Sequence, residues 1–265
     1  MKTISLLGSG WLGLVLARFF VQQGYRVHAS TRSELRFPEL VSCRAKPFKI
    51  DIEVCDAQSN DYHGFLDSDI LIVNITSKHM NGFARLISEI GQSSISKVLF
   101  VSSTSVYANT NGVVLESDGA EIADHPLLLI EHLFQSEASF DSTIIRFGGL
   151  FGYARHPGRF FSAGKIIQQP DAPVNMIHRD DCVNIVGRIV EQGIWGEVFN
   201  ACANTHPSKR DFYTRASISL GQAAPTLSDS GTGEYKVVSN AKLKQALNYE
   251  FVRGDLLQVD FDPAN

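Results

Sequence analysis

Glycines in a short turn near the N-terminus constrain the fold of this chain more than any other feature. Residues 4–24 read ISLLGSGWLGLVLARFFVQQG, in which an apolar run enters a glycine-bearing turn and an apolar helical pattern follows. In such a strand–turn–helix the first glycine permits a tight turn, the second lets the backbone approach a pyrophosphate, and the third lets helix and strand pack closely. The helix N-terminus then offers unpaired N–H groups to the phosphates. The pattern predicts a dinucleotide site, and the expected cofactor-binding residues of the turn are Gly8, Gly10, Trp11, Leu12 and Gly13.

Length and composition are those of an ordinary globular protein. The 265 residues are 44% hydrophobic and 20% charged, enough for one large domain or a domain with a smaller lobe. The net charge of −4 provides no basic footprint for nucleic acid or an anionic membrane, and no apolar run could span a bilayer. The cysteines are scattered without a C-x-x-C pair, which predicts no metal site or disulfide framework and suits a reducing cytoplasm. They are Cys43, Cys55, Cys182 and Cys202.

Apolar strand-like runs alternate with helical patterns through most of the chain, which is typical of βαβ units and a parallel sheet. The expected strands are Ile4–Leu7, Arg26–Ser30, Phe48–Ile50, Asp69–Ile75, Lys97–Ser102, Thr143–Phe147 and Val198–Ala201. The expected helices are Leu12–Gln23, Asn81–Ile90, Leu127–Ala138 and Cys182–Gln192. The alternation loosens after Phe147, where residues 148–164 are rich in glycine, arginine and aromatic residues.

These patterns predict an α/β fold: a Rossmann-type doubly wound parallel sheet with a small C-terminal substrate lobe. We expect residues 1–150 to form the dinucleotide-binding core, with 174–203 contributing its last strand and helix. Residues 151–173 and 204–265 would form the smaller substrate-binding lobe. Ligands of such folds bind at the carboxyl edge of the sheet.

The end of the second expected strand favours NADP over NAD. In the NAD version of this unit an acidic residue about 20 residues beyond the turn binds the ribose 2′-hydroxyl. Here the strand end reads HASTRS, so Thr31 and Arg32 stand where the acid would be, and a guanidinium would bind a 2′-phosphate. The alternative is that Arg32 is a solvated arginine after a strand. Asp51 and Ile52 follow the third strand, where the aspartate would either accept from an adenine amino group or stabilise a turn.

Four segments together resemble the extended branch of the short-chain dehydrogenase/reductase superfamily, the NAD-dependent epimerase/dehydratase group, which includes nucleoside-diphosphate-sugar epimerases. The first is the glycine turn. The others resemble that group's fifth strand with its Ser-Ser-x-x-Val-Tyr ending, its sixth strand with an Arg before a glycine-bearing turn, and its Ile-His-x-x-Asp motif. These segments are FVSSTSVYA (100–108), IIRFGGLFG (144–152) and VNMIHRDDCV (174–183).

The chain departs from that family's pattern at two places, so it resembles an atypical member. The usual G-x-x-G-x-x-G spacing would put the first glycine at position 7, which is Leu7 here. The family's chemistry uses a Tyr and a Lys as Y-x-x-x-K on the helix after the fifth strand, where the lysine lowers the pKa of the tyrosine. The corresponding stretch, residues 124–140, reads DHPLLLIEHLFQSEASF and has neither residue. None of the seven tyrosines is followed by a lysine four positions later.

The resemblance places the family's catalytic Ser or Thr at Ser103. That residue would either orient a substrate oxygen or make a local hydrogen bond at a strand end. Tyr107 belongs to the family's Val-Tyr pair and is expected to pack in the interior. His125, Glu131 and His132 lie near the emptied catalytic positions and could supply a substitute acid, although a solvated helix surface is the expectation for all three.

Further polar residues have both a structural and a functional interpretation. Asp180 and Asp181 precede a helical pattern and are expected to cap it, while His178 is expected to brace the structure. Arg155 and Arg159 lie on the loop expected to border the substrate site, where guanidinium groups would bind a diphosphate. The alternative for both arginines is a solvated basic loop.

The sequence therefore predicts an NAD(P)-dependent, epimerase/dehydratase-like oxidoreductase. Its expected substrate is a nucleotide sugar or another small hydroxyl or carbonyl compound. The expected cofactor is NADP, with NAD as the alternative. We expect a cytoplasmic protein, with homodimerisation open, and with no metal, nucleic-acid or membrane partner. The rival interpretation, favoured by the missing Tyr-Lys dyad, is a non-catalytic NADP(H)-binding sensor or partner-binding module.

Overall fold

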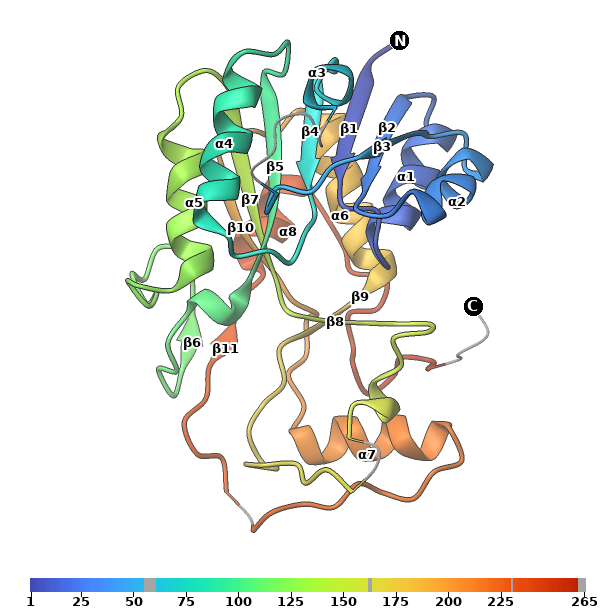
Figure 1. The fold of residues 1–265 in the computed structure, drawn as a ribbon. Coiled ribbons are helices and arrows are strands. Elements are labelled where there is room, and N and C mark those ends of the chain that lie inside the picture. The colour runs from blue at the N-terminus through green and yellow to red at the C-terminus, as the bar shows by residue number, and fades with distance from the viewer. Residues whose placement is uncertain (55–60, 162–163, 230, 262–265) are drawn as a thin grey trace. The chain divides into compact units, whose positions relative to one another are not determined.

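The computed structural model describes residues 1–54, 61–161, 164–229 and 231–261, and its centre is a seven-stranded parallel sheet (Figure 1). The strand order is β10-β7-β5-β4-β1-β2-β3, so the order along the chain reverses between β1 and β4. The strands are β1 (Thr3–Leu7), β2 (Arg26–Thr31), β3 (Lys46–Lys49), β4 (Ile70–Val73), β5 (Lys97–Ser103), β7 (Asp141–Phe147) and β10 (Val198–Ala201). This sheet confirms the Rossmann-type α/β fold. Each of its strands overlaps one that the sequence predicts, although β3 begins and ends earlier than the predicted Phe48–Ile50.

Four of the described helices also follow the sequence patterns. They are α1 (Gly13–Gln22), α4 (Met80–Gly91), α5 (Pro126–Ser136) and α6 (Arg179–Gln192). The patterns do not single out the short α2 (Phe37–Ser42) and α3 (Tyr62–Phe65), because so few residues cannot show a helical period. The remaining elements are α7 (Lys209–Ser219), α8 (Ala241–Leu247), β6 (Val113–Val114), β8 (Gly149–Phe151), β9 (Met176–His178), β11 (Val237–Val238) and the 3₁₀ turns η1 (Glu34–Arg36), η3 (Thr104–Val106) and η4 (Pro157–Arg159).

The chain divides into two compact units, each continuous in space and discontinuous in sequence. The first contains Met1–Ser102, Ala123–Ile145 and Ile189–Val198. The second contains Ser103–Ile122, Arg146–Arg188 and Phe199–Asn265.

The core of the first unit is formed by the central strands and the helices that cover them. Each residue of β4 is buried, as expected of a parallel strand covered on both faces. The helices α4 and α5 pack side by side on one face of the sheet and α1 lies on the other (Figure 1). Phe134 of α5 meets Phe83 of α4 and Phe100 of β5, with ring centroids 6.0 and 4.9 Å away. These aromatic contacts hold α4 and α5 against the sheet.

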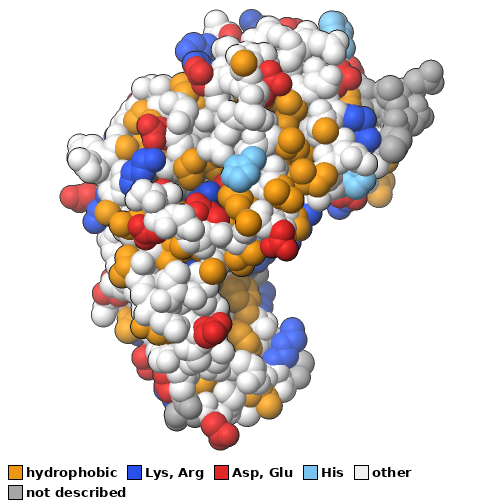
Figure 2. Space-filling model, turned by 90° about the vertical axis from the view of Figure 1, so that its left-hand side faces the viewer, with side chains coloured by type: hydrophobic (Ala, Val, Ile, Leu, Met, Phe, Trp, Pro, Cys, Tyr) orange, Lys and Arg blue, Asp and Glu red, His pale blue; other side chains and the backbone are white. Residues whose placement is uncertain are grey.

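The described helices are too short or too polar to span a membrane, and the face shown in Figure 2 carries charges of both signs. In the described part of the chain, no helix combines the length and apolarity needed to cross a bilayer. On the face shown in Figure 2, acidic and basic side chains alternate with apolar ones, and neither sign forms a continuous patch. This mixture agrees with the small net charge of −4.

Asp181 organises the C-terminal part of the second unit and does not cap a helix. The expectation that Asp180 and Asp181 precede their helix is wrong, because α6 begins at Arg179. The Asp181 carboxylate is fully buried and accepts hydrogen bonds from the Tyr249 hydroxyl at 2.6 Å and from the backbone N–H groups of Val252 and Arg253 at 2.7 and 3.0 Å. One carboxylate therefore ties α6 to the chain segment after α8.

Asp180 has different partners. It accepts a hydrogen bond from the Tyr153 hydroxyl at 2.7 Å and lies 3.3 Å from the imidazole of His178. Burial acts to raise the pKa of Asp180, but the bonds from His178 and Tyr153 outweigh it and lower the pKa. Since His178 is itself buried within this cluster, the geometry agrees with the structural role expected for it.

Replacement of Asp181 by alanine should destabilise the fold strongly. Asp181→Ala leaves three donors without their acceptor in a buried position, which should lower the free energy of unfolding by about 3 kcal/mol in chemical denaturation. The matched control is Asp141→Ala, whose carboxylate is 61% exposed and pairs with Lys97, and which should cost less than about 1 kcal/mol. Equal losses for the two variants would contradict the assignment of Asp181.

Acid should weaken the fold partly through His206. Burial lowers the pKa of His206 from 6.5, and its bond to the Val174 carbonyl oxygen opposes this only in part. The unfolded chain therefore binds a proton at a higher pH than the folded chain does, and stability falls as pH drops below 6.5. His206→Asn should reduce the loss of unfolding free energy between about pH 7 and about pH 5 relative to the parent protein. An unchanged pH slope in the His206 variant would exclude this contribution.

Candidate functional site

Hydrogen bonds hold the glycine turn between β1 and α1 against the neighbouring strands. Gly8 has a φ of +96°, which a side chain would strain. Its N–H donates to the Ser30 hydroxyl at 2.9 Å, and its carbonyl oxygen accepts from the Asn74 side-chain amide at 3.1 Å. Ser9 donates from its hydroxyl to the Ser30 carbonyl oxygen at 2.6 Å. The ends of β2 and β4 therefore hold the turn in one conformation.

The space around each glycine shows which of them the fold itself requires. A Cβ atom on Gly13 would lie 2.0 Å from the Gly8 carbonyl oxygen, so helix and turn pack in direct backbone contact. A Cβ on Gly8 would lie 2.4 Å from the Asn74 carbonyl oxygen. By contrast, a Cβ on Gly10 would meet nothing within 4 Å. Gly8 and Gly13 are required by packing, whereas Gly10 borders open space, as expected where a ligand approaches the backbone.

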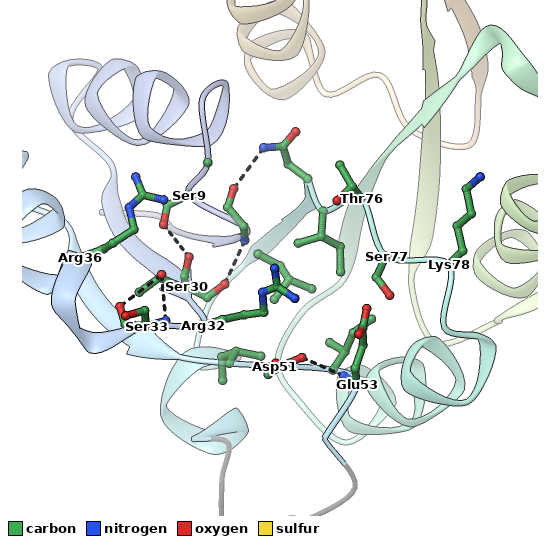
Figure 3. Close-up of a pocket in the computed structure, with 18 residues that line it drawn as sticks. Ser9, Ser30, Arg32, Ser33, Arg36, Asp51, Glu53, Thr76, Ser77 and Lys78 are labelled. Atoms are coloured by element: carbon green, nitrogen blue, oxygen red, sulfur yellow. Dashed lines mark hydrogen bonds between the residues drawn. The ribbon is translucent and has the colours of Figure 1, made fainter.

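A cavity of about 720 Å³ lies beside this turn (Figure 3). Its walls come from the carboxyl ends of β1, β2, β3 and β4 and from the residues that follow them, all within the first unit. Of the predicted cofactor-binding residues, the cavity is lined by Gly8, Gly10, Thr31, Arg32, Asp51 and Ile52, while Trp11, Leu12 and Gly13 do not line it.

Arg32 and Arg36 give one side of this cavity a basic character. Arg32 follows the last residue of β2 and lies exposed in the cavity wall (Figure 3). Arg36 belongs to η1, and its guanidinium donates from Nη2 to the Glu39 carboxylate at 2.7 Å. Thr31 is buried, and its hydroxyl interacts with the Ser33 backbone. Arg36 was not among the predicted site residues. The only signal for it in the sequence is its position shortly after Arg32.

Asp51 and Ile52 form the base of the cavity after β3. The Asp51 carboxylate accepts the backbone N–H of Glu53 at 3.0 Å, which is the local turn bond of the structural interpretation. Asp51 nevertheless lines the cavity, so the two interpretations of this residue are compatible. Ile52 is buried, and its carbonyl oxygen accepts from the guanidinium of Arg85 on α4 at 2.8 Å.

Residues after β4 complete the cavity. Asn74, Thr76, Ser77 and Lys78 line it, and none of them was predicted as a site residue. Their signal in the sequence is their place at the end of the apolar run DILIVNI, which contains Asn74, or directly after it. The carboxyl ends of neighbouring parallel strands share one edge of a sheet.

The helix at the position of the missing dyad carries a buried carboxylate. Glu131 of α5 is fully buried, so the expectation of a solvated position is wrong for it. The Ser102 hydroxyl donates to Glu131 at 2.5 Å, which joins α5 to β5 inside the first unit. The other two candidates behave differently: His132 is exposed, and the His125 imidazole accepts the Leu127 N–H at the start of α5. Helical spacing alone could not reveal which of these side chains meets a polar partner in the interior.

Ser103 ends β5, the strand next to β4 in the sheet. Its Oγ accepts the backbone N–H of Ser105 at 3.1 Å, which is the local bond considered from the sequence. A serine hydroxyl that accepts one hydrogen bond still has its own hydrogen to donate. The local bond therefore fixes the position of Oγ and does not preclude a bond to a ligand.

Tyr107 is a packing residue. It is 1% exposed, and its hydroxyl donates to Asn200 at 2.9 Å and accepts from Arg146 at 2.6 Å. Arg146 in turn bonds Glu121 at 2.6 Å. Burial raises the pKa of Tyr107, with Arg146 opposing it. A buried phenol with a raised pKa and both bonds satisfied is a poor acid, in agreement with the structural role predicted for it.

The two arginines of the expected substrate loop lie in and beside η4. Arg155 and Arg159 are both exposed. Arg155 donates from Nε to the Leu150 carbonyl oxygen at 2.8 Å and faces the Phe160 ring at 5.8 Å. The nearby His156 is buried instead, and burial lowers its pKa.

The described cysteines and acidic residues form no metal site. No three His, Cys, Asp or Glu side chains converge on a point anywhere in residues 1–54, 61–161, 164–229 and 231–261. Cys43, Cys182 and Cys202 are free thiols in the interior, and Cys55 lies outside the described residues. Burial raises the pKa of Cys182 and raises that of Cys202 to about 12, which makes both thiols unreactive.

Solved structures with the same fold include proteins of the epimerase/dehydratase type. A structure from Methylobacillus flagellatus named as an NAD-dependent epimerase/dehydratase is 26% identical, with a TM-score of 0.79 over 96% of this chain and 94% of the other. A Bacillus cereus UDP-glucuronic acid 4-epimerase in complex with UDP-glucuronic acid and NAD has a TM-score of 0.77 at 19% identity, covering 99% and 98% of the two chains. The chain has the fold of the extended short-chain dehydrogenase/reductase superfamily, and the resemblance seen in the sequence is confirmed.

One curated relative matches over the full length. The chain is 27% identical to Protein YeeZ of Escherichia coli K12 over 277 residues, covering 99% of this chain and 100% of the relative. No family model matches the sequence.

The glycines provide a test that separates folding from binding. Gly13→Ala places a methyl group against the Gly8 carbonyl oxygen and should destabilise the protein by about 2 kcal/mol. Gly10→Ala meets open space and should change stability by less than about 0.5 kcal/mol, while weakening dinucleotide binding measured by calorimetric titration. A Gly10 variant that binds as tightly as the parent would show that no ligand approaches the backbone there.

Proposed function

We propose that this chain is an NADP(H)-dependent oxidoreductase of the epimerase/dehydratase type, acting on a nucleotide sugar or another small hydroxyl or carbonyl compound. The coarser class is that of the solved relatives, which include an NAD-dependent epimerase/dehydratase and a UDP-sugar epimerase in complex with NAD. The preference for NADP, the substrate and the roles of individual residues are our own proposals.

The observation that carries the cofactor assignment is the cavity beside the glycine turn. The turn exposes backbone over Gly10, where a pyrophosphate would fit, and lies where the strand order reverses, the usual dinucleotide position in doubly wound sheets. Arg32 lines the cavity directly after β2, at the position where the NAD version of this unit has an acidic residue. A guanidinium attracts a 2′-phosphate and offers paired donors to its oxygens, which supports NADP over NAD.

The residues of the chain would divide the binding of the cofactor between them. Gly10 would bind the pyrophosphate through its backbone, beside the tight turn that Gly8 forms; Arg32 would bind the 2′-phosphate, and Asp51 the adenine amino group. Trp11, Leu12 and Gly13 would shape the turn without lining the cavity. Once bound, the cofactor would supply hydride transfer at its nicotinamide.

Ser103 would orient the reacting oxygen of the substrate. Its Oγ is held by the Ser105 N–H, and the remaining hydroxyl hydrogen can donate to a carbonyl or alkoxide oxygen. Arg155 and Arg159 are proposed to contact the diphosphate of a nucleotide sugar, which their exposed guanidinium groups suit. Water or a substrate hydroxyl would take the place of the missing tyrosine in proton transfer.

The second candidate is a non-catalytic NADP(H) sensor or partner-binding module. One observation favours it: α5 contains neither Tyr nor Lys, and its polar residue in the interior, Glu131, is bonded to Ser102. Both candidates require dinucleotide binding, and they differ in turnover. We further propose a cytoplasmic location, in keeping with the free buried thiols, and leave homodimerisation to sizing experiments.

Cofactor preference is tested by titration of the purified protein with NADPH and NADH. The parent should bind NADPH at least about tenfold more tightly, and Arg32→Gln should remove most of that difference while leaving NADH affinity nearly unchanged. Arg26→Gln is the matched control, since Arg26 is an exposed residue at the opposite end of the same strand. Preference for NADH in the parent would overturn the assignment of NADP.

Turnover separates the enzyme from the sensor. The protein is mixed with NADPH or NADP and a panel of nucleotide sugars, aldehydes and ketones, while nicotinamide absorbance and product stereochemistry are followed. We expect turnover that falls about tenfold or more in kcat in Ser103→Ala, with unchanged NADPH affinity. Full activity of that variant would remove Ser103 from the mechanism, and tight NADPH binding without turnover would establish the sensor.

A further inference from the structure

A second cavity adjoins the end of β2. It measures about 500 Å³ and shares Arg32 and Ser33 with the larger cavity described above. Its other lining residues are Glu34, Leu35, Pro38 and Lys49. Arg32 therefore lines two cavities of the first unit. A group bound to its guanidinium could contact residues of both cavities.

The register between β2 and β3 places a second cation, Lys49, near Arg32. Lys49 is the last residue of β3, and it is paired in the parallel ladder with Thr31, the last residue of β2. Arg32 follows Thr31 directly. Two positively charged side chains thus extend from adjacent positions at the carboxyl edge of neighbouring strands, and both line the second cavity.

A hydroxyl group lines the second cavity together with these cations. Ser33 precedes η1, and its side chain makes no capping bond there. Its backbone N–H is engaged by the Thr31 hydroxyl. The Ser33 hydroxyl is therefore able to donate toward the cavity that it lines, together with the guanidinium and the ammonium.

Another anion can displace the Glu34 carboxylate from Lys49. The ammonium of Lys49 lies 3.5 Å from the Glu34 carboxylate, and the two side chains are 53% and 67% exposed. An exposed pair of this kind contributes little to stability and is screened by salt. A phosphate monoester carries nearly two negative charges at neutral pH and competes well with a single carboxylate.

We propose that Lys49, with Arg32, forms a subsite for a phosphate monoester on the ribose of the dinucleotide, and that Lys49 is a specificity-determining residue for NADP(H). The inference rests on the proposed function, because it assigns a second residue to the same cofactor. Glu34 holds Lys49 in the ligand-free protein and opposes the binding of the phosphate. The subsite thus draws on two strands, β2 and β3.

The direct test compares two lysines of β3. Lys49→Gln should weaken NADPH binding about 3- to 10-fold in calorimetric titration and leave NADH affinity within about twofold, because only NADPH carries the phosphate. Lys46→Gln is the matched control: Lys46 lies on the same strand, its ammonium is over the Phe48 ring at 4.8 Å, and it lines neither cavity. That control should change neither affinity, and melting temperatures of all variants show whether the fold is retained.

Glu34 provides a test in the opposite direction. Glu34→Gln removes the carboxylate that competes with the phosphate, so NADPH should bind about 2- to 3-fold more tightly while NADH is unaffected. The gain should vanish when Glu34→Gln is combined with Lys49→Gln, because no ammonium is then left to release.

The results for these variants separate the Lys49 subsite from the proposed binding of NADP(H). If the parent prefers NADPH and Arg32→Gln abolishes that preference while Lys49→Gln preserves it, the Lys49 subsite is overturned and the proposed function stands. Equal weakening of NADPH and NADH by Lys49→Gln also overturns it, because the effect would then not concern the phosphate. If the parent prefers NADH or binds neither dinucleotide, the cofactor proposal fails first, before any variant is compared.

Discussion

The backbone contact between Gly8 and Gly13 is the constraint on which the glycine turn and the cavity beside it depend. With 2.0 Å between a notional Cβ on Gly13 and the Gly8 carbonyl oxygen, α1 can lie against β1 only if position 13 has no side chain. Asn74 and Ser30 then hold the same turn from β4 and β2. The conformation of the turn is set by packing and hydrogen bonds within the protein, so the backbone over Gly10 is already arranged before any ligand arrives.

The departure from the family is concentrated on α5. The resemblance implies a tyrosine and a lysine there, and the chain instead directs Glu131 inward to Ser102. A carboxylate buried in this way, with a hydroxyl donor, joins helix and strand and contributes to the fold. The glycine turn with its cavity therefore has the arrangement that the resemblance implies, while α5 lacks the tyrosine and lysine that it implies.

The sequence predicted the parts of the molecule whose pattern is local. Alternating apolar runs sufficed for the seven strands of the sheet, and the three glycines sufficed for the turn. Prediction failed where a side chain finds its partner far away in the chain. Asp181 looked like a helix cap and instead binds the segment around Tyr249, and Glu131 looked solvated and instead meets Ser102. Such partners depend on tertiary packing, which a periodic pattern does not specify. Lys78 and Arg36 were missed for a related reason, because only the shared edge of the sheet brings them to one cavity.

We propose that the cavity at the carboxyl ends of β1, β2, β3 and β4 holds NADP(H). A crystal structure of the protein grown with NADPH tests this most directly. We expect the pyrophosphate against the backbone of Gly10 and the 2′-phosphate within hydrogen-bond distance of Arg32. A dinucleotide bound elsewhere, or one whose 2′-phosphate turns away from Arg32, would contradict it.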